Sequence, residues 1–242
     1  MHFGNDVYID GVNLTADDFY EKLRNGGETP TTAQPNPHKF EEAFRECLDK
    51  DEDILCLLIA EELSGTVQSA HIAKEAVQSK RIRIIDTRSA CVAIGLLVRI
   101  AAEKAKAGAT LESLYDEMMD LKDRAKILAG VETLEYLKKG GRLSGTAAMI
   151  GTMLNLHPIL SVADGKVLNV DKARGKKKMF SIIYQWAEKD GIDLSYPIIF
   201  AHGASEENCE KLVEVFRENI KMDDIFYGAI GPVVGTYTGP GV

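Results

Sequence analysis

A chain of 242 residues that is 45% hydrophobic and 27% charged can bury a sizeable core, as one large domain or two modest ones. Its formal net charge of -8 opposes nonspecific binding to nucleic acid or to an anionic membrane, because both require a basic surface. No apolar run approaches the roughly 20 residues of a membrane helix, and the N-terminus lacks a basic start followed by an apolar block. We therefore expect a soluble, cytoplasmic protein with no integral membrane segment.

The cysteines and histidines form no metal-binding pattern. The cysteines are widely spaced without a CxxC pair, which argues against a zinc site and against a disulfide-stapled secreted scaffold. We expect four reduced, mostly buried thiols, at Cys47, Cys56, Cys91 and Cys209. The histidines are isolated, with no HExxH or comparable spacing, and are expected to be surface or core residues: His2, His38, His71, His157 and His202. The sequence predicts no metal ligand.

The first half of the chain has the pattern of a parallel α/β/α domain. Continuous apolar runs at 54–60 and 82–86 have strand length, and a helical pattern at 66–78 separates them. Two apolar strands joined by one helix predict a parallel βαβ unit with a right-handed crossover. Two further helices are predicted at 89–107 and 111–124. We assign residues 1–124 to this N-terminal domain.

The pattern changes from Lys126 onward, and the second half predicts a mixed sheet. A short strand to Val131 precedes a helix that ends at Gly140, and Asp164-Gly165 between two short apolar runs indicates a hairpin. The remaining predicted elements are a small helix at 147–153, helices at 175–189 and 205–219, and strands at 197–202 and 225–230. We assign residues 125–242 to a C-terminal α/β domain, on the change of pattern alone.

Ser64 lies in a Ser-Gly-Thr segment between the end of a predicted strand and the first turn of a helix. Unpaired backbone N–H groups and the positive end of the helix dipole favour an anion there, and ligands of open α/β sheets bind at that edge. An alternative is that Ser64 or Thr66 merely caps the helix. A catalytic nucleophile is disfavoured, because the segment is not a GxSxG elbow. For Ser89, after the second strand, capping of the following helix is the favoured interpretation.

Two loops hold further candidates. Thr32 lies in TTAQPNP, where the prolines favour an extended, stiff backbone that can keep a hydroxyl aimed, although a plain surface connection fits equally well. Gly140 and Gly141 permit the positive φ that ends a helix, and the loop then presents Arg142. The basic run Lys172, Arg174 and Lys176 to Lys178 is typical of a solvated face.

Five segments in this order and spacing resemble one known family. They are TTAQP at Thr31 to Pro35, LSGTVQSA at Leu63 to Ala70, TLEYLKKGGRLS at Thr133 to Ser144, NLHPIL with the basic run after it, and the terminal IGPVVGTYTGPGV. The chain resembles the DegV family, bacterial fatty-acid-binding proteins that present a bound acyl chain to a separate kinase. The resemblance covers nearly the whole chain and implies a two-domain α/β fold with the ligand site between the halves.

The resemblance also implies roles for particular residues. Thr32 and Ser64 match family positions that contact the fatty-acid carboxylate, and Arg142 matches an arginine that docks the kinase. The family has a histidine before TGPG, where this chain has Tyr237, whose phenol can donate the same hydrogen bond but carries no positive charge. The implied protein is a non-catalytic carrier without a cofactor other than its bound long-chain fatty acid, and its kinase partner feeds phospholipid synthesis.

The chain departs from the family pattern in ways that keep alternatives open. Ala33 replaces a serine, and the family's first strand and its residues beyond GPG have no counterpart in this sequence. An exposed sheet edge invites pairing, so we expect a monomer or a weak dimer. One alternative is an enzyme for a small phosphorylated or carboxylated metabolite, with Arg142 and Ser64 as anion clamps. Another is a truncated member without a ligand.

Overall fold

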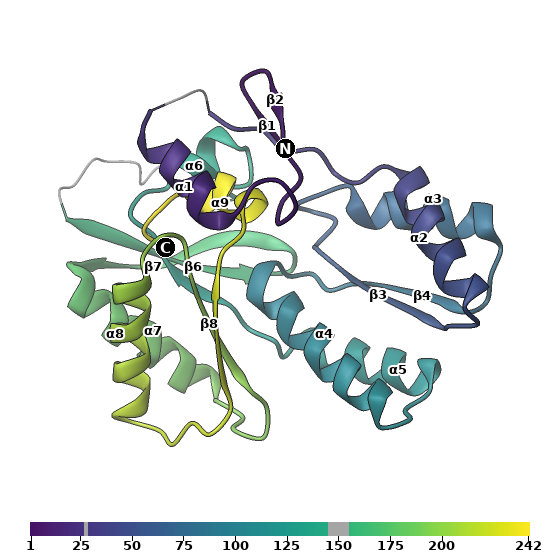
Figure 1. Ribbon diagram of the computed structural model, residues 1–242. Coiled ribbons are helices and arrows are strands. Elements are labelled where there is room, and N and C mark those ends of the chain that lie inside the picture. Colours follow the sequence, from purple (N-terminus) through teal and green to yellow (C-terminus); the bar gives the residue numbers. More distant parts are fainter. Residues whose placement is uncertain (27–28, 145–154) are drawn as a thin grey trace. The chain divides into compact units, whose positions relative to one another are not determined.

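The protein folds into two compact units in a computed structural model that describes residues 1–26, 29–144 and 155–242 (Figure 1). Unit 1 comprises Met1–Ala33, Ile127–Ser161 and Val167–Val242. Unit 2 comprises Gln34–Lys126 and Val162–Lys166. The division after Lys126 lies two residues from the predicted one, but residues 1–33 group with the second half of the chain rather than with the first.

Unit 2 is built on the predicted βαβ arrangement. Its strands are β3 (Ile54–Leu58) and β4 (Ile82–Asp86), and its helices are α2 (Pro37–Asp49), α3 (Thr66–Val77), α4 (Cys91–Lys106) and α5 (Leu111–Leu121). The strands pair in parallel from Ile54 opposite Ile82 to Leu58 opposite Asp86, and α3 connects them. The predicted parallel unit is therefore confirmed.

Helices cover both faces of this strand pair, with α2 and α3 on one face and α4 and α5 on the other (Figure 1). The first face has a core of Phe44, Val67, Ala70 and Ile82, all nearly inaccessible to solvent. The small residues Ser69, Ala70 and Ala73 of α3 are buried on this face. Asn36 caps α2 through its side chain, and Pro37 occupies the first turn of that helix. The capping signal of α2 was present in the sequence, although the helix was not predicted.

The tip of the predicted hairpin belongs to unit 2. Asp164 and Gly165 both have positive φ, as a two-residue turn requires. The Gly165 N–H donates to the Arg88 carbonyl over 3.0 Å, and the Arg88 guanidinium pairs with the Asp164 carboxylate. A side chain at Gly165 would meet Glu62 at 3.2 Å, which makes glycine the fitting residue there. The turn is thus held by backbone and ionic contacts.

Unit 1 contains the remaining elements. Its strands are β1 (His2–Phe3), β2 (Asp6–Val7), β5 (Leu128–Gly130), β6 (Leu156–Ala163), β7 (Lys166–Arg174), β8 (Ile198–His202) and β9 (Ile225–Ala229). The end of β6 and the start of β7, on either side of the hairpin turn, belong to unit 2. Its helices are α1 (Ala16–Arg24), α6 (Glu135–Lys139), α7 (Lys176–Asp190), α8 (Glu206–Arg217) and α9 (Pro232–Thr238). The helix expected at 147–153 lies outside the described residues.

Unit 1 contains both antiparallel and parallel strand pairs, as predicted for the second half of the chain. Strands β5, β6 and β7 are neighbours in that order, and β5 pairs antiparallel with β6. Strands β8 and β9 pair in parallel, with α8 between them in the chain. Together with the unit 2 strands, these pairings confirm the mixed α/β fold class.

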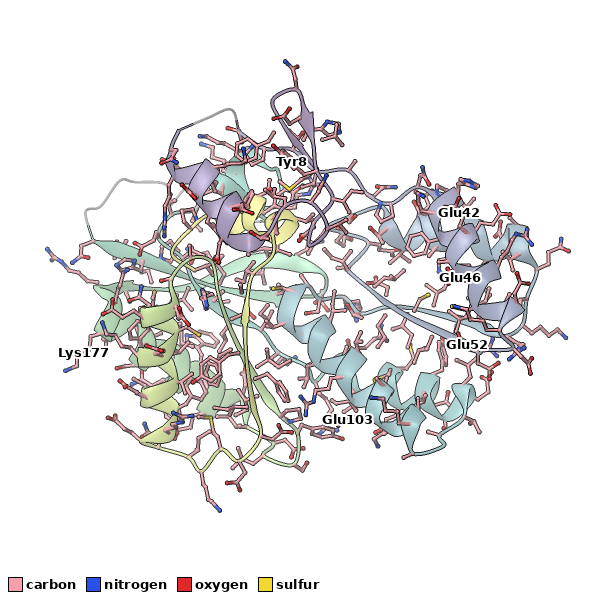
Figure 2. The ribbon with its side chains drawn as sticks, in the orientation of Figure 1. Tyr8, Glu42, Glu46, Glu52, Glu103 and Lys177 are labelled. Carbon is pink, nitrogen blue, oxygen red and sulfur yellow. The ribbon has the colours of Figure 1, made fainter. Side chains whose placement is uncertain are left out.

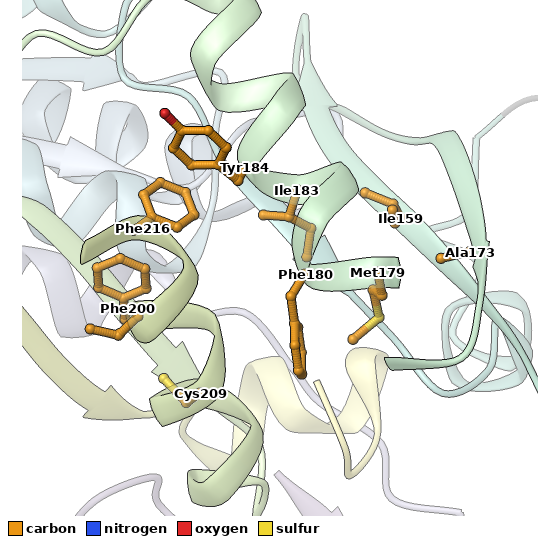
Figure 3. Packing of buried hydrophobic residues seen from close by; sticks show 10 residues of the cluster. Ile159, Ala173, Met179, Phe180, Ile183, Tyr184, Phe200, Cys209 and Phe216 are labelled. Atoms are coloured by element: carbon orange, nitrogen blue, oxygen red, sulfur yellow. The ribbon is translucent and has the colours of Figure 1, made fainter. Parts of the chain in front are cut away.

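A core rich in aromatic residues holds α7 and α8 against the strands of unit 1 (Figure 3). Phe216 lies between two other rings, with centroid distances of 5.2 Å to Tyr184 and 5.3 Å to Phe200, and both pairs are edge-to-face. That geometry suits the ring quadrupoles and adds to the burial of their area. Met179 at the start of α7 fits closely over Gly130, where a β-carbon would lie 2.3 Å from its sulfur.

The two ends of the chain meet in unit 1 through α1 and α9. Gly235 of α9 faces Phe19 and Tyr20, and a β-carbon there would lie 2.7 Å from both side chains. Asp10 accepts a hydrogen bond from the Val233 N–H over 2.9 Å and so satisfies one donor at the start of α9. Neither helix was predicted from the sequence. For α9 the reason is that the glycine- and proline-rich end of the chain has low helix propensity. In the part of the chain that is described, no helix combines the length and apolarity needed to cross a membrane.

Candidate functional site

The Gly-Gly-Arg loop differs from its prediction at one glycine. Helix α6 ends at Lys139, and Gly140 has helical φ and ψ of -75° and -9°. Only Gly141 uses the left-handed region, with φ of +68°. The expectation that both glycines supply positive φ was therefore wrong for Gly140.

An aromatic ring lies against Gly140 and leaves no space for a side chain at that position. A β-carbon at Gly140 would be 2.3 Å from Cδ1 of Tyr237, closer than real β-carbon contacts come. A second contact of this kind joins α6 and α9, since a β-carbon at Gly239, just after α9, would lie 2.3 Å from Cδ2 of Tyr136 on α6. The glycines that follow α6 and α9 thus let the two short helices approach and place the Tyr237 ring beside the loop.

Three of the predicted residues come together around that ring. The Tyr237 and Thr32 hydroxyl oxygens are 2.6 Å apart, so one donates to the other. The Arg142 guanidinium carbon lies 5.0 Å from the centroid of the Tyr237 ring, within the range of a cation–π contact. Arg142 Nη1 also donates to the Gly140 carbonyl over 2.7 Å. We call Thr32, Arg142 and Tyr237 the hydroxyl–arginine cluster.

The backbone around Thr32 is fixed by the start of the chain. Thr31 forms a bridge with His2, with N–H to carbonyl distances of 2.8 and 3.0 Å in the two directions. This pairing keeps the segment extended beside β1 and aims the neighbouring Thr32 hydroxyl at Tyr237. Thr32 therefore differs from a residue of a plain surface connection, because its hydroxyl forms a hydrogen bond with Tyr237 and the backbone beside it is paired with His2.

Ser64 lies in unit 2 and makes a separate contact. Its hydroxyl oxygen is 2.8 Å from that of Thr66, whereas the start of α3 has Gly65 at its cap position and no side-chain cap. The capping alternative for Ser64 and Thr66 is therefore wrong. The segment follows β3 and leads into α3, as predicted.

Gln34 links two of the segments that carry the family resemblance. Its Nε2 donates to the Gly65 carbonyl and to the Ser69 hydroxyl, each over 3.2 Å. A β-carbon at Gly65 would lie 2.3 Å from Gln34 Oε1, so glycine is needed for this approach. The sequence did not predict a role for Gln34, because a contact across 31 residues has no local signal.

Ser89 does not cap the helix that follows it. Ala90 occupies the cap position of α4 and has no side-chain cap, so that interpretation was wrong. The Ser89 hydroxyl is buried and has no hydrogen-bond partner among the residues that the structure describes, and its carbonyl accepts from the Ala60 N–H over 2.9 Å. Thr87 is also buried, and its hydroxyl donates to the Leu58 carbonyl over 2.7 Å. These residues join the ends of β3 and β4.

The basic run of β7 and α7 is a solvated surface. Lys176 pairs with Glu132 over 2.8 Å, and Lys177 projects from α7 (Figure 2). Lys172, Arg174 and Lys178 are exposed. The neighbouring Asp171 accepts from the Trp186 indole over 3.0 Å, and this hydrogen bond lowers the pKa of the carboxyl. The exposures agree with the interpretation made from sequence.

The cysteines and His157 are buried or half-buried. Cys209 is buried and the other three thiols are half-buried, and burial raises the pKa of Cys56 and of Cys209 to about 11. His157 is buried, with Nδ1 at 3.3 Å from a Glu132 oxygen. Over residues 1–26, 29–144 and 155–242, no three His, Cys, Asp or Glu side chains are grouped so as to hold a metal ion.

Unit 1 has a cavity of about 330 Å³ at its surface, away from the predicted residues. Its walls are formed by Tyr8, Asn13, Leu14, Asp18, Glu21, Lys22 and Asn25. Because neither Arg142 nor Ser64 lines it, this cavity is not the anion clamp of the enzyme alternative.

Comparisons with known proteins agree on one family. The family described as "Uncharacterised protein, DegV family" matches residues 1–242. A DegV domain-containing protein from Clostridium perfringens is 40% identical over 245 residues, covering 98% of this chain and 84% of the relative. A fatty acid-binding protein from Thermotoga maritima is 31% identical over 228 residues, covering 92% and 78%. The solved structure of a fatty-acid-binding DegV family protein from Thermus thermophilus matches with a TM-score of 0.89 and 33% identity, covering 99% of this chain and 86% of that one. On this evidence the chain belongs to the DegV family.

Proposed function

We propose that this protein binds one long-chain fatty acid and presents its carboxylate to a partner kinase. The observation that carries the proposal is the Thr32–Tyr237 hydroxyl pair, 2.6 Å apart, with the Arg142 guanidinium over the same ring. Two hydroxyls and a cation at one place suit a carboxylate. Relatives from Thermotoga maritima and Thermus thermophilus that are described as fatty-acid-binding support the ligand class.

The energetics of an acyl ligand fit this role. Each buried methylene contributes about 0.8 kcal/mol, so a dozen contribute on the order of 10 kcal/mol before the costs of association. The carboxylate must be met by donors, since an unpaired buried charge would cancel much of that gain. Thr32, Ser64 and Tyr237 are the residues that we propose as donors. The chain then needs no catalytic group of its own, because the partner performs the phosphoryl transfer.

We further propose that Arg142 takes part in docking the kinase. It follows the exposed Gly141 in a loop, and a guanidinium pairs with phosphate oxygens through a planar fork that lysine lacks. The partner would use ATP, so the proposed place of action is the cytoplasm, and the acyl phosphate would feed phospholipid synthesis.

Two assays test the proposal. Oleate should displace a fluorescent fatty acid from the purified protein, and with a fatty acid kinase and ATP the protein should support acyl-phosphate formation. The Arg142→Lys variant should keep nearly the parent's oleate affinity, because the charge remains, while acyl-phosphate formation falls sharply. Oleate binding without any kinase-dependent product would leave a fatty-acid-binding protein and remove the kinase from the account. Tight binding of a small phosphorylated metabolite in place of oleate would favour the enzyme alternative.

A further inference from the structure

The loop after β3 holds Ser64 through one buried alanine. The N–H groups of Leu63 and Ser64 both donate to the Ala60 carbonyl, over 2.9 and 3.1 Å. Ala60 is inaccessible to solvent, and its own N–H donates to the carbonyl of Ser89 after β4 over 2.9 Å. We call residues 60–65 the Ser64 loop. The position of the Ser64 hydroxyl therefore depends on what holds Ala60 in place.

The tip of the β6–β7 hairpin packs against the Ser64 loop. A β-carbon at Gly165 would lie 3.3 Å from the Ala60 β-carbon and 3.2 Å from Glu62 Cγ, so the backbone of the turn is in direct contact with this segment. The turn and the loop both belong to unit 2. A tip that moved away would remove one of the contacts that hold the Ser64 loop.

Arg88 fastens this tip to unit 2. Its carbonyl accepts from the Gly165 N–H over 3.0 Å, and its guanidinium pairs with the Asp164 carboxylate. The guanidinium also lies 3.6 Å from an oxygen of Asp123, just after α5. Arg88 has a φ of +52°, a region that is costly for a residue with a β-carbon, and the hydrogen bond from its N–H to Asp86 Oδ1 over 2.8 Å supports that conformation. Arg88 therefore connects the turn to the ends of β4 and α5.

The same hairpin is also bonded to the loop that presents Arg142. Val167, just after the turn, forms a parallel bridge with Leu143, and its carbonyl accepts from the Ser144 N–H over 3.2 Å. These contacts lie within unit 1. One hairpin therefore has its turn fixed to the Ser64 loop in unit 2 and the start of its second strand fixed to the Arg142 loop in unit 1.

We propose that Arg88 positions the Ser64 loop through the hairpin tip and so determines how long the protein retains its fatty acid. The inference rests on the proposed function and assigns a positioning residue that does not itself touch the ligand. A ligand held between two segments leaves when those segments separate, so the strength of their fastening acts mainly on the dissociation rate. The Arg88 pair with Asp164 is exposed, and exposed pairs contribute little to stability, which limits the expected change in rate to a few-fold.

The test measures, by stopped flow on the full chain, how fast a bound fluorescent fatty acid is released into excess oleate. Arg88→Gln should release it about two- to fivefold faster than the parent, and Arg88→Lys should stay closer to the parent because the charge remains. Release from the parent should also speed up between about 0.05 and 0.5 M salt, since salt screens an exposed ion pair, whereas Arg88→Gln should respond less. Arg45→Gln is the matched control, because it removes an arginine from another exposed ion pair of unit 2, with Glu41, and should leave the rate unchanged.

A double variant tests whether Arg88 acts through Asp164. Asp164→Asn should raise the release rate as Arg88→Gln does, and asparagine suits the left-handed φ of +50° at this position, so the turn is kept. The two changes together should raise the rate no further than Arg88→Gln alone, because each removes the same ion pair. Denaturant unfolding of every variant identifies any general loss of folding.

The outcomes distinguish this inference from the function on which it rests. A release rate of Arg88→Gln equal to the parent's, or an equal increase in Arg45→Gln, would overturn the inference and leave fatty-acid binding intact. Additive increases in the double variant, or the same salt dependence in the parent and in Arg88→Gln, would also overturn it, since the ion pair with Asp164 would then not be the fastening. A parent that binds no fatty acid would overturn the proposed function itself.

Discussion

Tyr237 shows how one residue sets the chemistry of the proposed site. The resemblance places a histidine here, and a protonated imidazole would add charge beside a carboxylate. A phenol donates a hydrogen bond and has no cationic form. The structure places the phenol against the Thr32 hydroxyl and the ring under a guanidinium, so hydrogen bonding and charge come from different residues.

Tyr237→Phe should weaken oleate binding, because it removes the hydroxyl and keeps the ring that Arg142 contacts. Parent affinity should stay flat between about pH 6 and 8, whereas Tyr237→His should bind more tightly as the pH falls through about 6.5, where imidazole gains its proton. Calorimetry across this range measures both effects. Tyr227→Phe, at an exposed position of β9, is the control. Equal affinities of the parent and Tyr237→Phe would show that the hydroxyl takes no part in binding.

Ser64→Ala should weaken oleate binding by about 1–3 kcal/mol, the cost of leaving a buried charged acceptor short of one donor. The Ser64 hydroxyl is 2.8 Å from that of Thr66, so the pair can offer a donor in place of a cap. The displacement assay measures the change, with Ser181→Ala on α7 as the control. An affinity equal to the parent's would remove Ser64 from the site.

At the scale of elements, the short helices α6 and α9 depend on glycines at their contact. Gly140 has ordinary helical angles and no room for a β-carbon, whereas Gly141 has room and a positive φ. Substitutions at Gly140 therefore test the effect of side-chain packing, and substitutions at Gly141 test the effect of backbone conformation.

Gly140→Ala should lower oleate affinity, because the new methyl group would push the Tyr237 ring away from Thr32. Gly141→Ala should leave oleate affinity close to the parent's but lower the free energy of unfolding by about 1–2 kcal/mol, the cost of a left-handed non-glycine residue. Displacement assays and denaturant unfolding measure the two quantities on both variants. Loss of affinity in Gly141→Ala alone would reverse this assignment.

Elements with strong local patterns were predicted well from the sequence. Strands β3 and β4 and the helix between them follow from continuous apolar runs and from the helical pattern, and their parallel pairing follows from the connection. Helix α9 was missed because its Gly- and Pro-rich sequence has low helix propensity, and packing on Phe19 and Tyr20 stabilises it instead. The steric role of Gly140 was missed because Tyr237, whose ring lies against it, is distant in sequence.

At the scale of the molecule, the division into units depends on contacts that no local pattern encodes. Residues 1–33 join the second half of the chain, through the packing of α1 on α9 and the hydrogen bond from Val233 to Asp10. Thr32 and Tyr237 therefore share unit 1, whereas Ser64 and Gln34 belong to unit 2. The prediction that one carboxylate site includes both Ser64 and Tyr237 stays a prediction.

Native mass spectrometry of the protein purified from a bacterial host tests the central claim most directly. The account predicts a species heavier than the chain by one long-chain fatty acid, which is released on denaturation and replaced by oleate when oleate is added in excess. Thr32→Val combined with Tyr237→Phe should carry less of the bound lipid than the parent. A parent that shows only the mass of the bare chain, before and after incubation with oleate, would contradict the account.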